Sequence, residues 1–175
     1  MTRNVNVITA GPSAGKSSTI RELSARGYRT LPEAARIVLD QRISEGDDPE
    51  KVRQEDDFHE QVERIDRKIE RQIPNSEPVF LDRSLLDNVA YRRHFNNNDC
   101  KNYEMLLDEC ENYYDNIFIL ERIDFQDDAV RSEDEQEAQE IHSLIVDSYE
   151  MLGYSPVHIP VKPVDERVDM ILNNI

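Results

Sequence analysis

The sequence predicts an α/β protein in which helices cover both faces of a parallel sheet. Five short apolar runs, rich in β-branched and aromatic residues, alternate with longer stretches of helical spacing. The chain has 175 residues, which suits one ordinary core, and no repeat or Gly/Ser-rich linker divides it. We therefore expect a single domain over residues 1–175, with ligands bound beyond the carboxyl ends of the strands.

The five apolar runs are predicted as strands because each is short and lies near turn signals. They are residues 5–9, 28–31, 79–81, 117–120 and 157–159. Helical spacing predicts helices at 17–26, from 58 to a break at Pro74, from 85 onward, at 103–114, at 138–152 and at 164–172. Gly27 and Gly153 end two of these helices, and Ser132 with Glu135 forms a capping box. Residues 46–49 are read as a turn, and the charges of residues 50–72 as a solvated helix face.

The charge balance argues against nucleic acid as a partner. Lys and Arg number 21 against 37 Asp and Glu, which gives a formal net charge of −16. A uniformly negative field repels phosphate backbones, so no nucleic acid is expected. A local cationic pocket can still overcome the overall sign and bind a nucleotide.

Composition excludes several other classes of protein. No apolar run approaches the roughly 20 residues of a membrane span, and no secretion leader is visible at the N-terminus. Cys100 and Cys110 are the only cysteines, and no His-Cys cluster surrounds them. We expect a cytoplasmic protein without a membrane span, a disulfide framework or a zinc site.

A phosphate-binding loop follows the first predicted strand. Residues 10–17 read Ala-Gly-Pro-Ser-Ala-Gly-Lys-Ser, a Walker A pattern with Ala10 in place of its first glycine. Lys16 is expected to contact the β- and γ-phosphates of ATP, and the Ser17 hydroxyl to bind Mg²⁺. The alternative is a strand-to-helix turn that binds nothing. The predicted nucleotide contacts in this segment are Gly11, Pro12, Ser13, Ala14, Gly15, Lys16, Ser17 and Ser18.

A second acidic element follows the third predicted strand. The apolar run at 79–81 ends in Asp82, as a Walker B strand does, and Arg83 comes next. Asp82 is a candidate to hold the Mg²⁺ shell or to take the proton of an acceptor hydroxyl. Arg83 is a candidate catalytic contact to a transferring phosphate or an anionic acceptor. The alternative is that Asp82 caps a helix beginning near Ser84.

The acceptor side is assigned to the end of the second predicted strand. Glu33 would accept hydrogen bonds from acceptor hydroxyls, and Arg36 lies nearly one helical turn further on. The alternative is a Glu favoured in a first helical turn by the helix dipole. Tyr91 and Arg92 also lie toward this side, and their positions alone leave their roles open.

A lid is expected at about residues 122–132. This acid-rich segment contains Arg131, the candidate lid arginine that closes onto the phosphates, although Arg131 could instead only balance charge. Arg122 is a candidate contact to the nucleotide base or phosphates. His59, His94, His142 and His158 show no ligand spacing and are read as surface or core residues.

Four segments in this order resemble the NadR/Ttd-like AAA family of P-loop ATPases and kinases, which includes the ribosylnicotinamide kinase domain of NadR. They are residues 10–17, Leu-Pro-Glu-Ala-Ala-Arg at 31–36, Val-Phe-Leu-Asp-Arg-Ser at 79–84 and Asp-Asp-Ala-Val-Arg at 127–131. The resemblance runs from Val5 to about Arg167. It implies a P-loop NTPase of nucleoside-kinase-like, three-layer α/β/α fold with a five-stranded parallel sheet. The departures are Ala10, and Arg122 where relatives often carry Pro.

By matching positions, the resemblance implies roles for individual residues. Lys16 and Ser17 would hold ATP and Mg²⁺, and Asp82 would be the catalytic or metal-linked acid. Glu33 would contact the acceptor and Arg131 would be the lid arginine.

The leading functional hypothesis is an ATP- and Mg²⁺-dependent kinase that transfers the γ-phosphoryl group to a nucleoside-like hydroxyl. Its expected partners are ATP and an unidentified small-molecule acceptor. One alternative is an NTPase without a small acceptor, and another is a nucleotide-dependent switch or adaptor. Asp82 and Arg83 together with Glu33 favour an acceptor pocket, and therefore the kinase.

Overall fold

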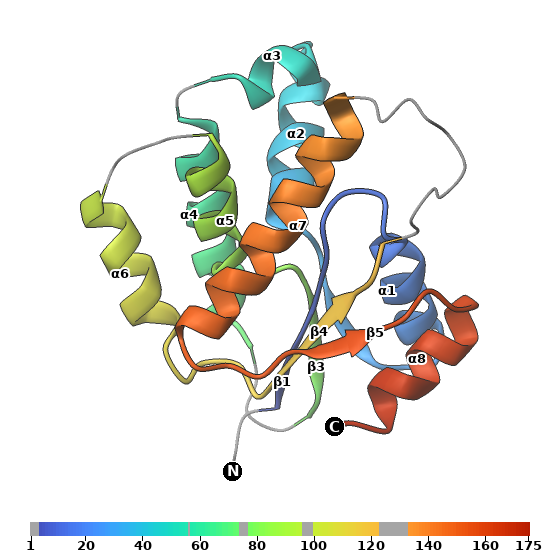
Figure 1. Cartoon of the computed structure of the whole chain (residues 1–175). Coiled ribbons are helices and arrows are strands. Elements are labelled where there is room, and N and C mark those ends of the chain that lie inside the picture. Colours follow the sequence, from blue (N-terminus) through green and yellow to red (C-terminus); the bar gives the residue numbers. More distant parts are fainter. Residues whose placement is uncertain (1–3, 56, 74–76, 96–99, 123–132) are drawn as a thin grey trace.

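The structure is a computed structural model that describes residues 4–55, 57–73, 77–95, 100–122 and 133–175 (Figure 1). Its elements, in chain order, are β1 (Val5–Thr9), α1 (Lys16–Ala25), β2 (Arg29–Leu31), α2 (Ala34–Ser44), α3 (Pro49–Arg53), α4 (Phe58–Glu70), β3 (Val79–Asp82), α5 (Asp87–His94), α6 (Cys100–Cys110), β4 (Asn116–Leu120), α7 (Glu133–Met151), β5 (Val157–Ile159) and α8 (Val164–Leu172).

The five predicted strands form one parallel sheet, in the order β2-β3-β1-β4-β5. Each agrees with its predicted range to within one residue at either end. β1 and β3 are neighbours, and their register places Ile8 beside Asp82. The carboxyl ends of β1, β2 and β3 therefore meet at one edge of the sheet, which is where parallel sheets bind ligands.

Helices cover both faces of this sheet, so the predicted three layers are confirmed. Along β3, Val79 and Leu81 face one apolar cluster and Phe80 faces the other, as the two-residue repeat of a strand requires. One cluster includes residues of α5, α6 and α7, and the other includes residues of α1 and α8. Figure 1 shows α1 and α8 together on one side of the sheet, with α5 and α7 on the other.

A third, smaller apolar cluster joins α2, α3 and α4. Apolar spacing in the sequence did not reveal α2 and did not separate α3 from α4. α3 has only five residues and begins with Pro49 after Asp48, whose side chain accepts a hydrogen bond from the Glu50 N–H at 2.9 Å. A helix of one turn is too short for apolar periodicity to reveal it.

The expectation of a solvated charged face over residues 50–72 is wrong for three carboxylates of α4. Glu63, Asp66 and Glu70 are 4%, 7% and 6% exposed. Each is buried with a partner: the Arg92 guanidinium, the Asn88 amide and the Leu85 N–H donate to them respectively. These partners come from α5 and the turn before it, which pack on the same side of α4.

Two other helix ends differ from the predictions. α5 begins at Asp87, because the Ser84 N–H donates to the Asp87 carboxylate at 2.8 Å and residues 84–86 form a turn. α6 ends at Cys110, so Tyr114 lies beyond it. Among the described helices, none combines the length and apolar character needed to cross a membrane.

Candidate active site

The phosphate loop joins the end of β1 to the start of α1, and two of its glycines are required by the local structure. Gly15 has a φ of 76°, in the left-handed region that favours glycine. Gly11 lies against α7, where an added Cβ would come within 2.7 Å of the His142 Cβ and 2.9 Å of the Ala138 carbonyl oxygen. The other predicted nucleotide contacts of the loop and first helical turn are Pro12, Ser13, Ala14, Ser17 and Ser18. The loop therefore has the strand–loop–helix context in which backbone amides bind phosphate.

Lys16, Asp82 and Glu33 meet at the carboxyl edge of the sheet. The Lys16 Nζ forms an ion pair with Asp82 Oδ1 and lies 3.7 Å from Glu33 Oε2. Lys16 is 8% exposed, so its ammonium group is held at the inner end of the loop. Three residues predicted separately from the sequence are thus in direct electrostatic contact.

Burial and charge act differently on the two carboxyl groups. Burial raises the pKa of Asp82 above its ordinary value, and the charge of Lys16 offsets this only in part. Burial also acts to raise the pKa of Glu33, but the charges of Arg83 and Lys16 outweigh it and the pKa lies below its ordinary value. Asp82 therefore binds a proton more readily than an ordinary aspartate, whereas Glu33 keeps its negative charge.

A hollow of about 520 Å³ opens beside the loop, and its lining includes Ser17, Glu33, Arg36 and Asp82. Hydroxyl and carboxylate oxygens are the ligands that Mg²⁺ prefers, and in kinases the ion is bound by one or two carboxylates together with substrate phosphates and waters. Ser17 is exposed at the start of α1 and Asp82 ends β3, so both oxygen donors face the place where the phosphates would lie. The donor set therefore fits Mg²⁺.

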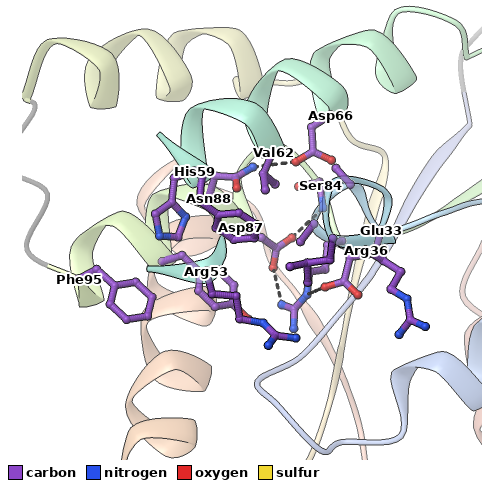
Figure 2. Close-up of a pocket in the computed structure, with 16 residues that line it drawn as sticks. Glu33, Arg36, Arg53, His59, Val62, Asp66, Ser84, Asp87, Asn88 and Phe95 are labelled. Atoms are coloured by element: carbon purple, nitrogen blue, oxygen red, sulfur yellow. Dashed lines mark hydrogen bonds and ion pairs between the residues drawn. The ribbon is translucent and has the colours of Figure 1, made fainter. Parts of the chain in front are cut away.

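A second, more enclosed pocket of about 290 Å³ lies between α2, α4 and α5 (Figure 2). Its aromatic lining consists of Phe58, His59, Tyr91 and Phe95. Glu33 and Arg36 line this pocket and also the hollow beside the loop. The two cavities therefore adjoin at these two residues, one cavity on the phosphate side and one on the side predicted for the acceptor.

Arg83 forms part of the wall of the enclosed pocket. Its Nε donates to Glu33 Oε1 at 2.8 Å, its Nη1 lies 3.7 Å from Asp87 Oδ1, and its guanidinium carbon lies 5.2 Å from the centre of the Tyr91 ring. Arg83 has a φ of 70°, a left-handed conformation that is uncommon for a residue with a side chain and often marks a functional site. Its buried Nη1 has no hydrogen-bond partner among the described residues. That N–H can donate to an oxygen of a bound molecule.

Asp87, which no sequence pattern indicated, contacts the Arg83 guanidinium from the buried side of the pocket wall. It is 2% exposed and accepts hydrogen bonds from the Ser84 N–H and the Tyr149 hydroxyl, both at 2.8 Å, and from the Thr9 hydroxyl. This network ties the end of β1 and helix α7 to the carboxylate that faces Arg83. Arg83 is therefore positioned by buried neighbours on several sides.

The inner end of the enclosed pocket is polar. The Asn88 amide donates to Asp66 Oδ2 at 2.7 Å, and both residues line the pocket (Figure 2). Burial raises the pKa of Asp66 well above its ordinary value, which favours the protonated, uncharged form of this carboxyl group. Burial lowers the pKa of His59, which leaves its ring neutral. The pocket thus offers uncharged donors and acceptors beside aromatic rings.

The remaining predicted site residues are placed less directly. Arg36 lies on α2 and pairs with Asp40, with Nε and Oδ1 2.9 Å apart. The Arg122 Nη2 lies 2.8 Å from Glu135 Oε1 on α7, and its buried Nη1 has no partner among the described residues. Arg131, Ser132 and the rest of the expected lid after Arg122 lie outside the described residues. The roles of Arg36, Arg122 and Arg131 stay predictions.

Two residues that were not predicted at the site contact the phosphate loop. The Gly11 N–H donates to His142 Nδ1 at 3.1 Å, and burial lowers the pKa of His142, which favours the neutral ring that can accept this bond. The Arg167 Nη1 donates to the Ala14 carbonyl at 3.1 Å. Both come from helices more than 130 residues along the chain from the loop, so no local pattern could have indicated them.

Comparison with known proteins agrees with this geometry. A family model described as an AAA domain matches residues 5–167. Comparison with curated proteins found no match. Among solved structures, the chain is similar to deoxyadenosine kinase from M. mycoides with bound dATP, with a TM-score of 0.60 and 20% identity over 98% of each chain.

Two further structures show the same fold. The NadR protein in complex with NR gives a TM-score of 0.69 at 16% identity over 98% of this chain, which spans 49% of that protein. Thymidylate kinase from Ehrlichia chaffeensis gives 0.64 at 13% identity over 99% of this chain and 98% of that one. These likenesses confirm the expected P-loop NTPase fold. The chain belongs to the AAA domain family and has the fold of P-loop phosphotransferases, as the resemblance to the NadR-like kinase domain implied.

Proposed function

We propose that this protein is an ATP- and Mg²⁺-dependent kinase that transfers the γ-phosphoryl group of ATP to a hydroxyl of a small, nucleoside-like acceptor. The observation that carries the proposal is the junction of the two cavities at Glu33 and Arg36. An NTPase that uses only water needs no second enclosed pocket beside its phosphate loop. A switch protein needs no buried arginine directed at such a pocket.

In this reaction, an acceptor hydroxyl oxygen forms a bond to the γ-phosphorus, the bond from that phosphorus to the bridging oxygen breaks, and ADP leaves. Lys16 neutralises charge on the β- and γ-phosphates, and the loop amides orient them. Mg²⁺, held through Ser17 and Asp82, would supply further charge neutralisation on the same oxygens. Asp82, held beside the Lys16 ammonium at this edge of the sheet, is the carboxylate that would take the acceptor proton.

Glu33 and Arg83 position the acceptor. Glu33 stays ionised and can accept hydrogen bonds from acceptor hydroxyls, and the Glu33–Arg83 ion pair holds its carboxylate at the boundary of the two cavities. The Arg83 Nη1, which has no hydrogen-bond partner among the described residues, can donate to the attacking hydroxyl or to the transferring group. Together these residues bring the reactants into line, which accounts for most of the catalysis in phosphoryl transfer.

The enclosed pocket suits a planar, polar acceptor. Its volume of about 290 Å³ lies just below the roughly 300–1,000 Å³ that is usual for small-molecule sites, so the acceptor is small. Four aromatic rings can stack on a base, and Asp66 with Asn88 offers hydrogen bonds to the edge of a base. Three structural relatives support an acceptor of this class. They are a deoxyadenosine kinase, a thymidylate kinase and a NadR protein in complex with NR.

The test is an acceptor screen. The protein is incubated with ATP, Mg²⁺ and each of a panel of nucleosides and nicotinamide riboside, and products are identified by mass spectrometry. Formation of a monophosphate with release of one ADP per product is the expected result. ADP release that is equal with and without acceptor identifies an NTPase, and nucleotide binding without turnover identifies a switch; either result refutes the proposal.

A further inference from the structure

A third cavity, which lies outside the proposed active site, concentrates positive charge. It is a hollow of about 660 Å³ lined by residues of α4, α5 and α6, which we call the cationic hollow. Its lining comprises Glu60, Glu63, Arg64, Arg67, Lys68, Arg71, Gln72, Arg92, Met105 and Glu109. Basic side chains outnumber acidic ones five to three there, although acids outnumber bases 37 to 21 in the whole chain. The local excess of positive charge therefore runs against the composition of the protein.

The three acidic side chains of the hollow balance only part of this charge, and one of them, Glu60, is exposed. Glu63 pairs with Arg92 and lies 3.5 Å from Arg67, and Glu109 lies 2.7 Å from the Arg67 Nε. These two acids are thus used by the two innermost arginines. Arg64, Lys68 and Arg71 lie along one exposed stripe of α4 and its C-terminal cap, and form no ion pair within the described part of the chain.

Arg92 supplies a second, independent indication of a ligand. It is 5% exposed, and its Nε donates to Glu63, yet its Nη2 has no hydrogen-bond partner among the described residues. An unsatisfied buried N–H on a charged group destabilises the protein, and a ligand oxygen that accepts from it would remove that cost. An acceptor oxygen that enters the hollow would meet this N–H at its inner wall, and the cations of α4 at its rim.

The hollow is separate from the proposed acceptor pocket. The residues of α4 that line the pocket are 58, 59, 62 and 66, whereas those that line the hollow are 60, 63, 64, 67 and 68. At 3.6 residues per turn, the two sets are centred on different faces of the helix and share no residue of α4. A molecule in the hollow is therefore not the phosphoryl acceptor.

We infer that the cationic hollow binds a small polyanion with several phosphate groups, such as a nucleoside triphosphate or an inorganic polyphosphate. The guanidinium groups of arginine match phosphate oxygens in pairs of hydrogen bonds, and four of the five cations here are arginines. The buried Arg92 donor lies at the inner wall of the hollow and the exposed cations lie at its rim. A matching ligand therefore has anionic oxygens both at its inner end and near the protein surface. A chain of phosphates has this shape, and the volume of the hollow lies within the range of small-molecule sites.

The test uses isothermal titration calorimetry with inorganic tripolyphosphate. The 175-residue chain carries Lys16→Ala, which weakens binding at the phosphate loop so that the hollow dominates the signal. A second protein adds Arg64→Gln, Lys68→Gln and Arg71→Gln, all at exposed positions of the hollow. A matched control instead adds Arg29→Gln, Lys51→Gln and Lys162→Gln, which remove the same charge at exposed positions elsewhere.

We expect the Lys16→Ala protein to bind tripolyphosphate, and the hollow variant to bind it at least about tenfold more weakly, since charged hydrogen bonds are lost. The control should change the Kd by less than about threefold, because only the long-range field differs. Absence of binding in the Lys16→Ala protein, or equal loss in the two variants, overturns the inference. Tighter binding of ATP than of tripolyphosphate would identify a nucleotide as the source of the phosphates. Tighter binding of a hexaglutamate peptide than of either phosphate ligand overturns the inference in favour of an acidic protein segment.

Discussion

We predict that the stability of the protein depends on pH through Glu70, a buried carboxyl group on α4. The carboxylate accepts hydrogen bonds from the Leu85 N–H at 2.8 Å and the Tyr114 hydroxyl at 3.0 Å. Burial raises the pKa of Glu70 from 4.5 to about 7, although these two hydrogen bonds act to lower it. The folded protein therefore keeps the Glu70 proton in a pH range where the unfolded chain has lost it.

The sign and size of the effect follow from proton linkage. Between pH 4.5 and about 7 the folded state binds one proton more than the unfolded state at this site, so stability falls as the pH rises. At about 1.4 kcal/mol per pH unit, this interval corresponds to a loss of roughly 3 kcal/mol, which is then constant above pH 7.

Glu70→Gln removes the titration but keeps an oxygen that can accept the same two hydrogen bonds. The variant should be close to the wild-type protein in stability at pH 4.5, and should gain on it by roughly 3 kcal/mol by pH 8. Urea denaturation at several pH values measures the difference in the free energy of unfolding. Asp66 is present in both proteins, but the charge of Glu70 acts to raise its pKa, so the difference reports Glu70 together with this coupling.

The control is Glu60→Gln, an exposed position on the same helix, which should show no such trend. A stability difference between Glu70→Gln and the wild type that stays constant from pH 5 to pH 8 would refute the reasoning. So would a wild-type protein that gains stability relative to the variant over that range.

Three further predictions concern catalysis. Lys16→Ala should lower kcat by about 10²-fold or more, because its charge acts on phosphates; unaltered turnover in a folded variant would contradict its assigned role. Asp82→Asn should lower kcat by about 10²-fold, whereas Glu33→Gln should raise the acceptor KM more than the ATP KM; steady-state kinetics of both variants with one acceptor decides whether these roles are divided. Arg167→Gln should raise the KM for ATP several-fold and leave the acceptor KM unchanged, because the Ala14 carbonyl of the loop loses its hydrogen-bond donor; equal KM values for ATP would show that Arg167 does not position the loop.

The strands and the phosphate loop could be predicted from the sequence because the interactions that define them are local. The alternation of Val79, Phe80 and Leu81 between two apolar clusters is a property of neighbouring residues. Gly15 and Lys16 need only the strand before them and the helix after them to form a phosphate-binding turn. The predicted strand at residues 5–9 therefore matches β1 fully. Lys16, Asp82 and Glu33 lie together at the strand ends, where the site was predicted.

Only the tertiary structure decided which charged residues are buried and what they contact. Glu63, Asp66 and Glu70 have the composition of a solvated helix face, and they are buried because α5 and the turn before it supply their partners. His142 and Arg167 reach the phosphate loop from helices 131 and 153 residues away from the positions they contact. A charge can leave water only where such partners are assembled around it. The positions of those partners depend on how distant segments pack, which no local pattern in the sequence records.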